Sequence, residues 1–281
     1  MSAFWFSLAV NTSFFLADVF IKLGSAESSA ARLIFVRSIY TVLLASIWMG
    51  ISGEAAFCPD IITIAHLVFC GVLCAIGLYY YIKALLHLHF VNVAVIGICG
   101  AFIHYALGVF LNHEHIVPYF YLAAGLSIAG ILLQWKKTKD KKGLYEAILS
   151  AITWGFGYAL LSLPLAHTSA IWGTWIMEAS TLVLSVMYLF WFDKSYSITK
   201  PNLKQWKIVI VAFFTILGSI LINISYQKFA LNMLGFMQLA FFPYSLIAGH
   251  FIFKERLNKM EWQGIALIVS GLVVYFLTCT N

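Results

Sequence analysis

The sequence predicts an all-α polytopic membrane protein with ten transmembrane helices, arranged as two inverted five-helix repeats. Three observations lead to this fold class: an apolar composition, a series of long apolar runs, and a similarity between the two halves of the chain. Of the 281 residues, 62% are hydrophobic and only 10% are charged. That is more apolar surface than a water-soluble domain of this size can bury.

The expected spans follow one another with short connections, so no separate soluble domain is expected. They cover residues 2–21, 32–50, 61–82, 92–111, 118–135, 143–163, 170–192, 206–226, 233–253 and 262–279. Each approaches the roughly 20 residues that a helix needs to cross about 30 Å of hydrocarbon. The strands of a membrane β-barrel alternate over about ten residues, whereas these runs are continuously apolar. The first run lacks the basic start and cleavage site of a signal peptide, which predicts a retained helix.

Lysine and arginine fall mainly in alternate loops. The loops after odd-numbered spans hold 15 of the 17, and the exceptions are Arg37 inside a span and Lys228 in an even-numbered loop. The positive-inside rule therefore places these loops in the cytoplasm and both termini on the non-cytoplasmic side of the cell (inner) membrane. Because the basic residues do not line one soluble surface, the net charge of +6 does not indicate nucleic acid as a partner.

The chain divides at its one dense charge cluster, the run KKTKDKKG at residues 136–143. We expect a first five-helix repeat at 1–135, a basic cytoplasmic linker at 136–142 and a second repeat at 143–281. Five spans per half is an odd number, so the second repeat should have the opposite orientation in the membrane. Two related bundles of this kind are common in transporters, where they exchange conformations around a central site.

A shift of 141 residues brings matching positions of the two halves together. It aligns Glu114 with Glu255, and it aligns Gly77, Gly108 and Gly130 with Gly218, Gly249 and Gly271. Each half thus has a fourth span that ends in glutamate and a fifth span with spaced glycines. At an offset of 145 residues, Tyr81 also matches Tyr226.

Together with Arg37 in Phe-Val-Arg, the run Thr-Trp-Gly-Phe-Gly at 153–157 and Pro243, these features resemble the drug/metabolite transporter superfamily in its EamA-like ten-helix branch. The resemblance covers nearly the whole chain. It fails at two positions: Phe102 stands where the first half should carry a proline, and Glu178 stands where a second arginine is expected.

The resemblance implies a secondary transporter or facilitator and not an enzyme. We expect a small organic metabolite, an amino acid or another zwitterionic or cationic amine, moved across the cytoplasmic membrane by alternating access. A nucleotide-linked or sulfonium metabolite such as S-adenosylmethionine, or a drug, is the alternative. The sequence lacks the phosphate-binding motif G-x-x-x-x-G-K-[ST]. This excludes transport driven by ATP hydrolysis within this chain.

A membrane-embedded enzyme or receptor is the more distant alternative. An enzyme would need a convergent nucleophile and base or paired metal ligands, and the spans supply neither clearly. No cofactor and no metal are therefore expected. The expected partners are the small-molecule substrate and membrane lipid, and the oligomeric state stays open.

Two charged residues inside spans are the first candidates for substrate contact. Glu178 lies on a polar stripe of the seventh span with Thr174, Thr181 and Ser185, and at the 141-residue offset its counterpart is Arg37. A charge at the centre of a span costs about 2.5–3.5 kcal/mol on insertion scales, so it indicates a function. We expect the two at depths that differ by about 10 Å, where they would hold the two ends of a zwitterion. A structural ion pair or a snorkelling arginine is the alternative.

Further candidates lie on other spans: Asn11 and Phe15 on the first, His104 on the fourth, Trp154 and Tyr158 on the sixth, and Gln238 and Ser245 on the ninth. Small and polar faces suit either a water-filled cavity or close helix packing. His104 is either a group that titrates near neutral pH or a hydrogen-bonded structural residue. The aromatic side chains suit an aromatic or cationic substrate, or else packing.

These faces predict a central cavity between spans 1, 3, 4, 6, 8 and 9, with Arg37 and Glu178 contributed by spans 2 and 7. Spans 5 and 10 should pack outside it, and Gly125, Gly130, Gly264 and Gly271 should let them approach closely. Asp18 and Lys22, four residues apart at the end of the first span, should form a local pair.

Overall fold

Helices occupy every one of the ten expected spans within the part of the chain that the structure, a computed structural model, describes. The described residues are 3–25, 29–113, 119–137, 140–192, 205–229, 231, 234, 238 and 241–279. The helices are α1 (Ala3–Ser25), α2 (Ala30–Ser52), α3 (Ile61–His87), α4 (Phe90–Ile98), α5 (Ala101–Asn112), α6 (Phe120–Lys137), α7 (Lys141–Leu160), α8 (Ser162–Leu165), α9 (Ala170–Phe192), α10 (Gln205–Lys228), α12 (Phe241–Ile247) and α13 (Lys259–Cys279), with the short turns η1 (Glu54–Ala56) and η3 (Ala248–Ile252).

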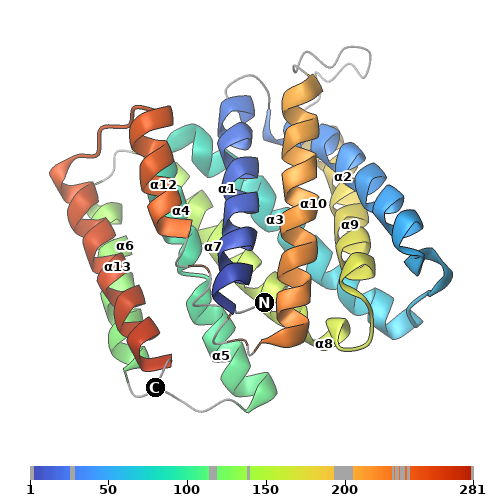
Figure 1. The fold of residues 1–281 in the computed structure, drawn as a ribbon. Helices are drawn as coiled ribbons and strands as arrows, with labels where there is room; N and C mark the ends of the chain where they lie inside the picture. The colour runs from blue at the N-terminus through green and yellow to red at the C-terminus, as the bar shows by residue number, and fades with distance from the viewer. Residues whose placement is uncertain are drawn as a thin grey trace.

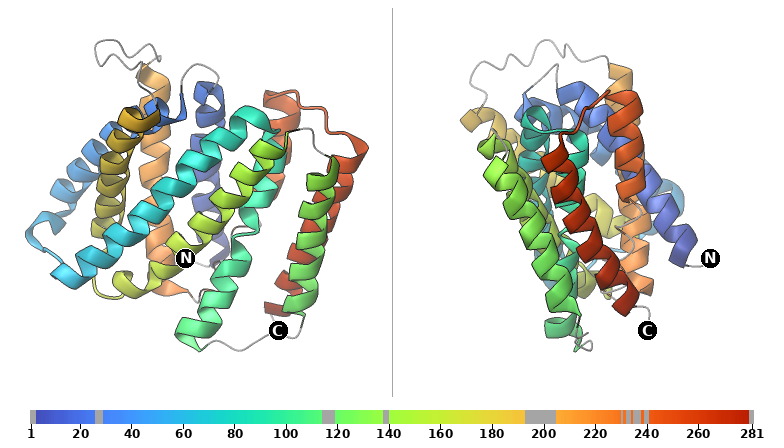
Figure 2. Two further views of the ribbon diagram at one scale, coloured as in Figure 1. Left: turned by 180° about the vertical axis from the view of Figure 1, so that it is seen from behind. Right: turned by 90° about the vertical axis from the view of Figure 1, so that its left-hand side faces the viewer.

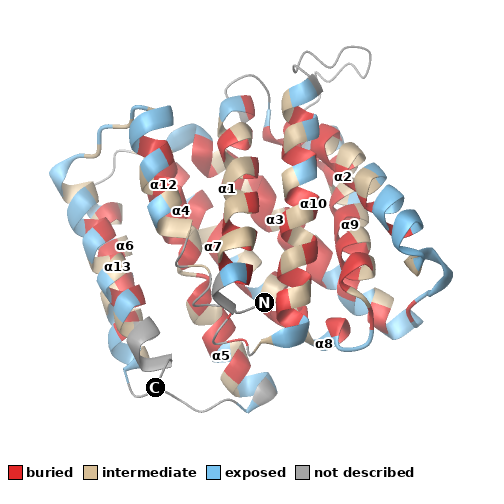
Figure 3. Cartoon of the chain, in the orientation of Figure 1, coloured by how far each residue is buried: buried red, intermediate tan, exposed pale blue. Residues whose placement is uncertain are grey.

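Seven helical stretches among the described residues are long and apolar enough to cross a membrane, and two shorter apolar helices, Phe120–Lys136 and Phe241–Ile252, accompany them. Large apolar side chains point outward: Phe110 is 81% exposed and Phe190 is 76% exposed. Polar side chains such as Asn92 and Ser185 are buried instead. Figure 3 shows the buried stripes facing the interior. This distribution suits a hydrocarbon solvent, and the protein is a multi-pass membrane protein.

The helices pair across the two halves of the chain. The main pairs are α1 with α10, α3 with α7, α2 with α9, and α6 with α13. α6 and α13 lie side by side at one edge of the molecule (Figures 1 and 2). α1 begins and α13 ends at the same end of the bundle (Figure 1). The opposite end carries the α1–α2, α3–α4, α6–α7 and η3–α13 connections, and we call it the basic-loop end.

The fourth expected span is two helices and not one. α4 stops at Ile98, and α5 begins at Ala101. Gly97 and Gly100 flank this break, and glycine weakens a helix because it loses more backbone freedom than other residues. A Cβ on Gly100 would lie 3.1 Å from the Ala151 carbonyl oxygen of α7. The break therefore sits where this segment crosses α7 closely.

Polar contacts join neighbouring helices at the basic-loop end. The Lys22 ammonium donates to the Leu85 carbonyl and, at 3.0 Å, to the Leu88 carbonyl, which lie at the end of α3. The last carbonyls of a helix lack partners within it and attract a cation. Among the described residues, the local Asp18–Lys22 pair expected from the sequence is not formed, because Lys22 turns to α3 instead.

Glu255 supplies the matching contact at the start of α4. Its carboxylate accepts from the backbone N–H of Phe90 at 2.6 Å and of Val91 at 3.4 Å. An acidic side chain at a helix N-terminus satisfies N–H groups that have no partner within the helix. A residue of the second half thus caps a helix of the first half. Its sequence counterpart, Glu114, lies outside the described residues.

The α6–α13 pair depends on three of the four glycines that the sequence singled out. A Cβ on Gly130 would lie 2.6 Å from the Gly264 carbonyl oxygen, and a Cβ on Gly271 would lie 2.5 Å from that of Ala123. These positions tolerate no side chain. The expectation is wrong for Gly125, where a Cβ would meet nothing within 4 Å, because this glycine lies on the exposed face of α6.

Replacing Gly130 by valine should separate α6 from α13 and lower the free energy of unfolding by about 1–3 kcal/mol, the usual range for overpacking. Gly125→Val is the matched control, since it makes the same change in the same helix on the open side. Thermal unfolding of both purified variants in detergent measures the difference. Equal losses in the two variants would contradict the close contact.

Candidate substrate cavity

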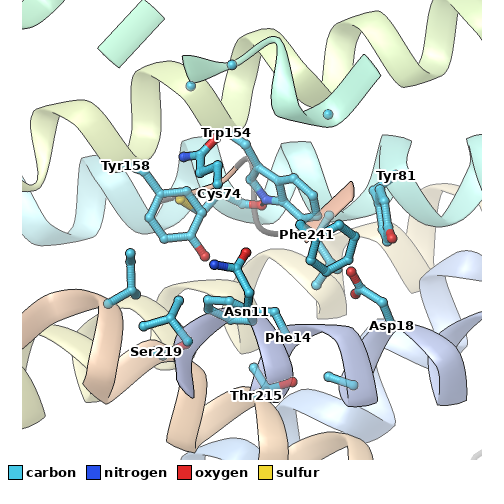
Figure 4. Close-up of a pocket in the computed structure, with 18 of the residues that line it drawn as sticks. Asn11, Phe14, Asp18, Cys74, Tyr81, Trp154, Tyr158, Thr215, Ser219 and Phe241 are labelled. Atoms are coloured by element: carbon cyan, nitrogen blue, oxygen red, sulfur yellow. Dashed lines mark hydrogen bonds between the residues drawn. The ribbon is translucent and has the colours of Figure 1, made fainter. Parts of the chain in front are cut away.

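A cavity of about 200 Å³ lies at the centre of the helix bundle. Its walls come from α1, α2, α3, α4, α5, α7, α9, α10 and α12, whereas α6 and α13 contribute no lining residue. This is the expected arrangement of the spans. The polar and aromatic part of the wall consists of Asn11, Phe14, Asp18, Arg37, Tyr81, His104, Trp154, Tyr158, Glu178, Thr181, Thr215, Ser219, Tyr226, Gln238 and Phe241. Figure 4 shows part of it.

Most of the candidate residues named from the sequence reach this cavity. Those in the wall are Asn11, Arg37, His104, Trp154, Tyr158, Glu178 and Gln238. Phe15 lies beside it and stacks on Tyr244, with 5.2 Å between ring centroids. Ser245 is fully buried within α12, where its hydroxyl donates to the Phe242 carbonyl at 2.8 Å. Neither of these two belongs to the lining.

Arg37 and Glu178 form a buried ion pair in the cavity wall. The Arg37 Nη2 atom lies 2.9 Å from Glu178 Oε2, and the Thr41 hydroxyl donates to the same oxygen at 2.7 Å. Arg37 is 4% exposed and Glu178 is 7% exposed. The pair connects α2 of the first half with α9 of the second. One carboxylate oxygen therefore already has two donors.

The expected difference of about 10 Å in depth is wrong for the charged groups, because the long arginine side chain extends to Glu178. Glu178 does not use every donor of Arg37. The buried Nε–H of Arg37 has no hydrogen-bond partner in the described part of the chain. The guanidinium is thus fixed by Glu178 in the cavity wall and keeps an unsatisfied N–H.

The rest of the polar stripe on α9 is satisfied by protein. The Asn223 amide of α10 donates to the Thr174 hydroxyl at 2.9 Å. The hydroxyls of Thr181 and Ser185 donate to carbonyls of their own helix. Polar groups without water must find such partners, and here α10 and the carbonyls of α9 itself supply them.

His104 sits between two polar neighbours, and both of its ring nitrogens are engaged. Nε2 lies 3.0 Å from the Tyr226 hydroxyl and Nδ1 lies 3.2 Å from Nε2 of Gln238. His104 is 1% exposed. These contacts favour the hydrogen-bonded structural interpretation of this histidine. They also bring together the first half, α10 and the segment before α12.

Aromatic rings form a large part of the wall. The Trp154 indole N–H donates to the Cys74 carbonyl at 3.0 Å, which fixes the ring against α3. Close approach of α3 and α7 makes this contact, since a Cβ on Gly77 would lie 2.5 Å from Trp154. Tyr158 and Tyr226 lie parallel, 6.4 Å apart. The position of the Trp154 ring is therefore set by contacts within the protein.

Several lining residues were not predicted from the sequence to contact the substrate: Asp18, Tyr81, Thr215, Ser219 and Tyr226. A signal was present for some of them. Asp18 follows Asn11 by seven residues, two helical turns, and so shares its face of α1. Tyr81 and Tyr226 match each other at the 145-residue offset, and both line the cavity. The described residues contain no group of three or more His, Cys, Asp or Glu that could hold a metal ion.

Arg37→Met should lower the free energy of unfolding by about 3–5 kcal/mol, because it leaves the buried Glu178 carboxylate without a counter-charge. Combining it with Glu178→Gln should restore most of the loss. Thr41→Val is the control, since it removes only a neutral donor and should cost about 1 kcal/mol. A double-mutant cycle on thermal unfolding in detergent measures the coupling. Additive single losses would show that the two charges do not stabilise each other.

Comparisons with known proteins agree with this architecture. Residues 141–277 match the family described as the EamA-like transporter family. No curated protein matches the chain. A solved structure described as "Crystal structure of protein" is similar in fold, with a TM-score of 0.68 and 15% sequence identity over 99% of this chain and 98% of that chain. Residues 141–277, nearly half of the chain, are thus similar to the EamA-like transporter family of the drug/metabolite transporter superfamily.

Proposed function

We propose that this membrane transporter carries a small organic metabolite, an amino acid or another zwitterionic or cationic amine, across the cell (inner) membrane by alternating access. The observation that carries the proposal is the central cavity, lined by residues from both halves of the chain. A site between two bundles is accessible from alternate sides when the bundles rock against each other. Both termini would lie on the non-cytoplasmic side and the basic loops in the cytoplasm.

Contacts between the halves support an inverted repeat of 1–135 and 143–281. Arg37 contacts Glu178, and the Ser127 hydroxyl contacts the Ile268 carbonyl at 3.5 Å. Both pairs are separated by 141 residues, which is the offset that aligns the halves in sequence. Residues at equivalent positions of two repeats touch where a twofold axis passes between them. The same offset carries α1 onto α7 and α3 onto α10. The α3–α7 pair and the α1–α10 pair are therefore equivalent contacts in the two repeats.

The contacts at the basic-loop end support alternating access. Lys22 joins α1 to the end of α3, and Glu255 joins the η3–α13 connection to α4. These polar contacts hold together helices that surround the cavity. Opening the cavity at this end requires that they break, and each is a hydrogen bond that water can replace. They would therefore act as the closed gate of one transport state.

The size and lining of the cavity favour a small substrate. At about 200 Å³ it is smaller than the roughly 300–1,000 Å³ typical of sites for drug-sized ligands. A nucleotide-linked metabolite would need a conformation with a larger cavity, whereas an amino acid or a small amine fits the cavity in this structure. Trp154, Tyr158 and Asn11 would contact its body, and His104 with Gln238 would form a polar rim. The Arg37 Nε–H would bind an acceptor group.

Uptake into proteoliposomes tests the proposal directly. Labelled amino acids, amines, nucleosides and sulfonium metabolites would each be offered with and without a pH or sodium gradient. We expect uptake of at least one amine or amino acid. Failure across the whole panel would favour the other functional class, a membrane-embedded enzyme or receptor.

Filling the cavity should stop this uptake. Gly97 lines the cavity, and a Cβ there would meet nothing within 4 Å. The Cβ of Gly97→Phe therefore fits without a clash, and the phenyl ring fills the volume that the substrate would occupy. We expect at least a roughly tenfold loss of uptake with little change in the unfolding temperature. Gly125→Phe places the same side chain at an equally open glycine of α6, outside the cavity. Equal uptake by the two variants would show that the cavity is not the transport site.

A further inference from the structure

Asp18 of α1 is a carboxylate of the cavity wall that the pairing of Arg37 with Glu178 leaves without a counter-charge. It is partly exposed, and that exposure is toward the cavity. Among the described residues, no lysine, arginine or histidine forms an ion pair with it. Lys22, one turn further along α1, donates to carbonyls of α3 instead.

The groups that face Asp18 do not balance its charge. Arg37 of α2 acts on it electrostatically but already contacts Glu178 at 2.9 Å. Tyr81 of α3 and Tyr158 of α7 are phenols, which are neutral at neutral pH. α10 and α12 contribute only uncharged groups to the wall. The lining thus holds two carboxylates and one guanidinium, an excess of one negative charge when Asp18 is ionised.

The Tyr81 hydroxyl lies beside the Asp18 carboxyl and forms a side-chain hydrogen bond with it. Tyr81 is 3% exposed, and its side chain points toward Asp18 from the opposite wall (Figure 4). A phenol that donates its O–H to a carboxylate keeps the lone pairs of its own oxygen as acceptors. Asp18 and Tyr81 together therefore offer oxygen acceptors to the N–H groups of a ligand. The Trp154 ring lies 4.9 Å from the Tyr81 ring, so the polar group borders the aromatic wall.

We propose that Asp18 and the Tyr81 hydroxyl bind the ammonium group of the substrate, so that the transporter takes a small monocationic amine. This inference rests on the proposed function and narrows its substrate class. An ammonium group supplies N–H donors for both oxygens, and the neighbouring rings attract a cation. A monocation brings the cavity to neutrality. A zwitterion does not, because its own carboxylate adds a third negative charge beside a guanidinium that Glu178 already occupies.

Matched sets of small molecules test the charge requirement on the purified full-length protein. The amines phenethylamine and 3-methylbutylamine are compared with the neutral alcohols 2-phenylethanol and 3-methylbutan-1-ol, and with the zwitterions phenylalanine and leucine. At equal ligand concentration, a ligand that binds more tightly raises the unfolding temperature more. We expect the amines to stabilise the protein more than either matched set. Stronger stabilisation by the zwitterions or the alcohols, or none by the amines, would overturn the proposal.

Two variants test whether amine binding depends on Asp18 and Tyr81, which we call the cation subsite. Asp18→Asn should fold, since it removes a charge from apolar surroundings, and should weaken amine binding by about ten- to a hundredfold, the range for a hydrogen bond to a charged group. Tyr81→Phe should weaken it by about fivefold. Glu54→Gln, at η1 and outside the cavity lining, removes the same charge and should bind the amines as the wild type does. Unchanged amine affinity in Asp18→Asn would refute the proposal, even if the pH dependence of transport changed, because Asp18 would then carry a proton.

Proteoliposome uptake separates this inference from the proposed function. If wild-type protein binds the amines through Asp18 but moves none of them, the cation subsite stands and the transport proposal fails for this class. If it transports a neutral or zwitterionic solute equally well with Asp18→Asn, the transport proposal stands and the cation subsite fails. Amine uptake that is lost with Asp18→Asn and kept with Glu54→Gln supports both.

Discussion

The lack of water in hydrocarbon is the constraint on which the rest of this structure depends. Every polar group that enters the membrane must find its partner within the protein. Helices satisfy the backbone, and the polar side chains turn to the interior. The Asn223–Thr174 contact and the engaged nitrogens of His104 are products of this requirement. The Arg37–Glu178 pair satisfies it for two charges at once.

That requirement also makes the exceptions informative. The buried Arg37 Nε–H has no hydrogen-bond partner in the described residues, and Arg37 belongs to the cavity lining. Asp18 lacks a counter-charge in the same wall. A group left unsatisfied in a site that a ligand can enter lowers the free energy of binding when the ligand supplies the missing partner. These groups are the basis on which we propose a polar, cationic substrate for this cavity in an otherwise apolar bundle.

Close helix contacts set the positions of these groups. Glycines at the α3–α7 crossing let Trp154 reach the Cys74 carbonyl, and glycines between α6 and α13 hold those helices together at the edge. The α4–α5 break at Cys99–Gly100 carries His104 into the cavity beside Tyr226. Rigid aromatic walls and a small number of fixed polar groups are the usual composition of a small-molecule site.

The sequence by itself determined the membrane class, the ten helical spans and seven residues of the wall, because apolar length and intramembrane polarity are local properties of the chain. The tertiary structure decided which partners those residues find. It joined Arg37 to Glu178, turned Lys22 to α3 and left Asp18 facing the cavity. Pairing across helices depends on side-chain reach and helix crossing. Sequence spacing places a residue on a face of its helix but does not specify what stands opposite.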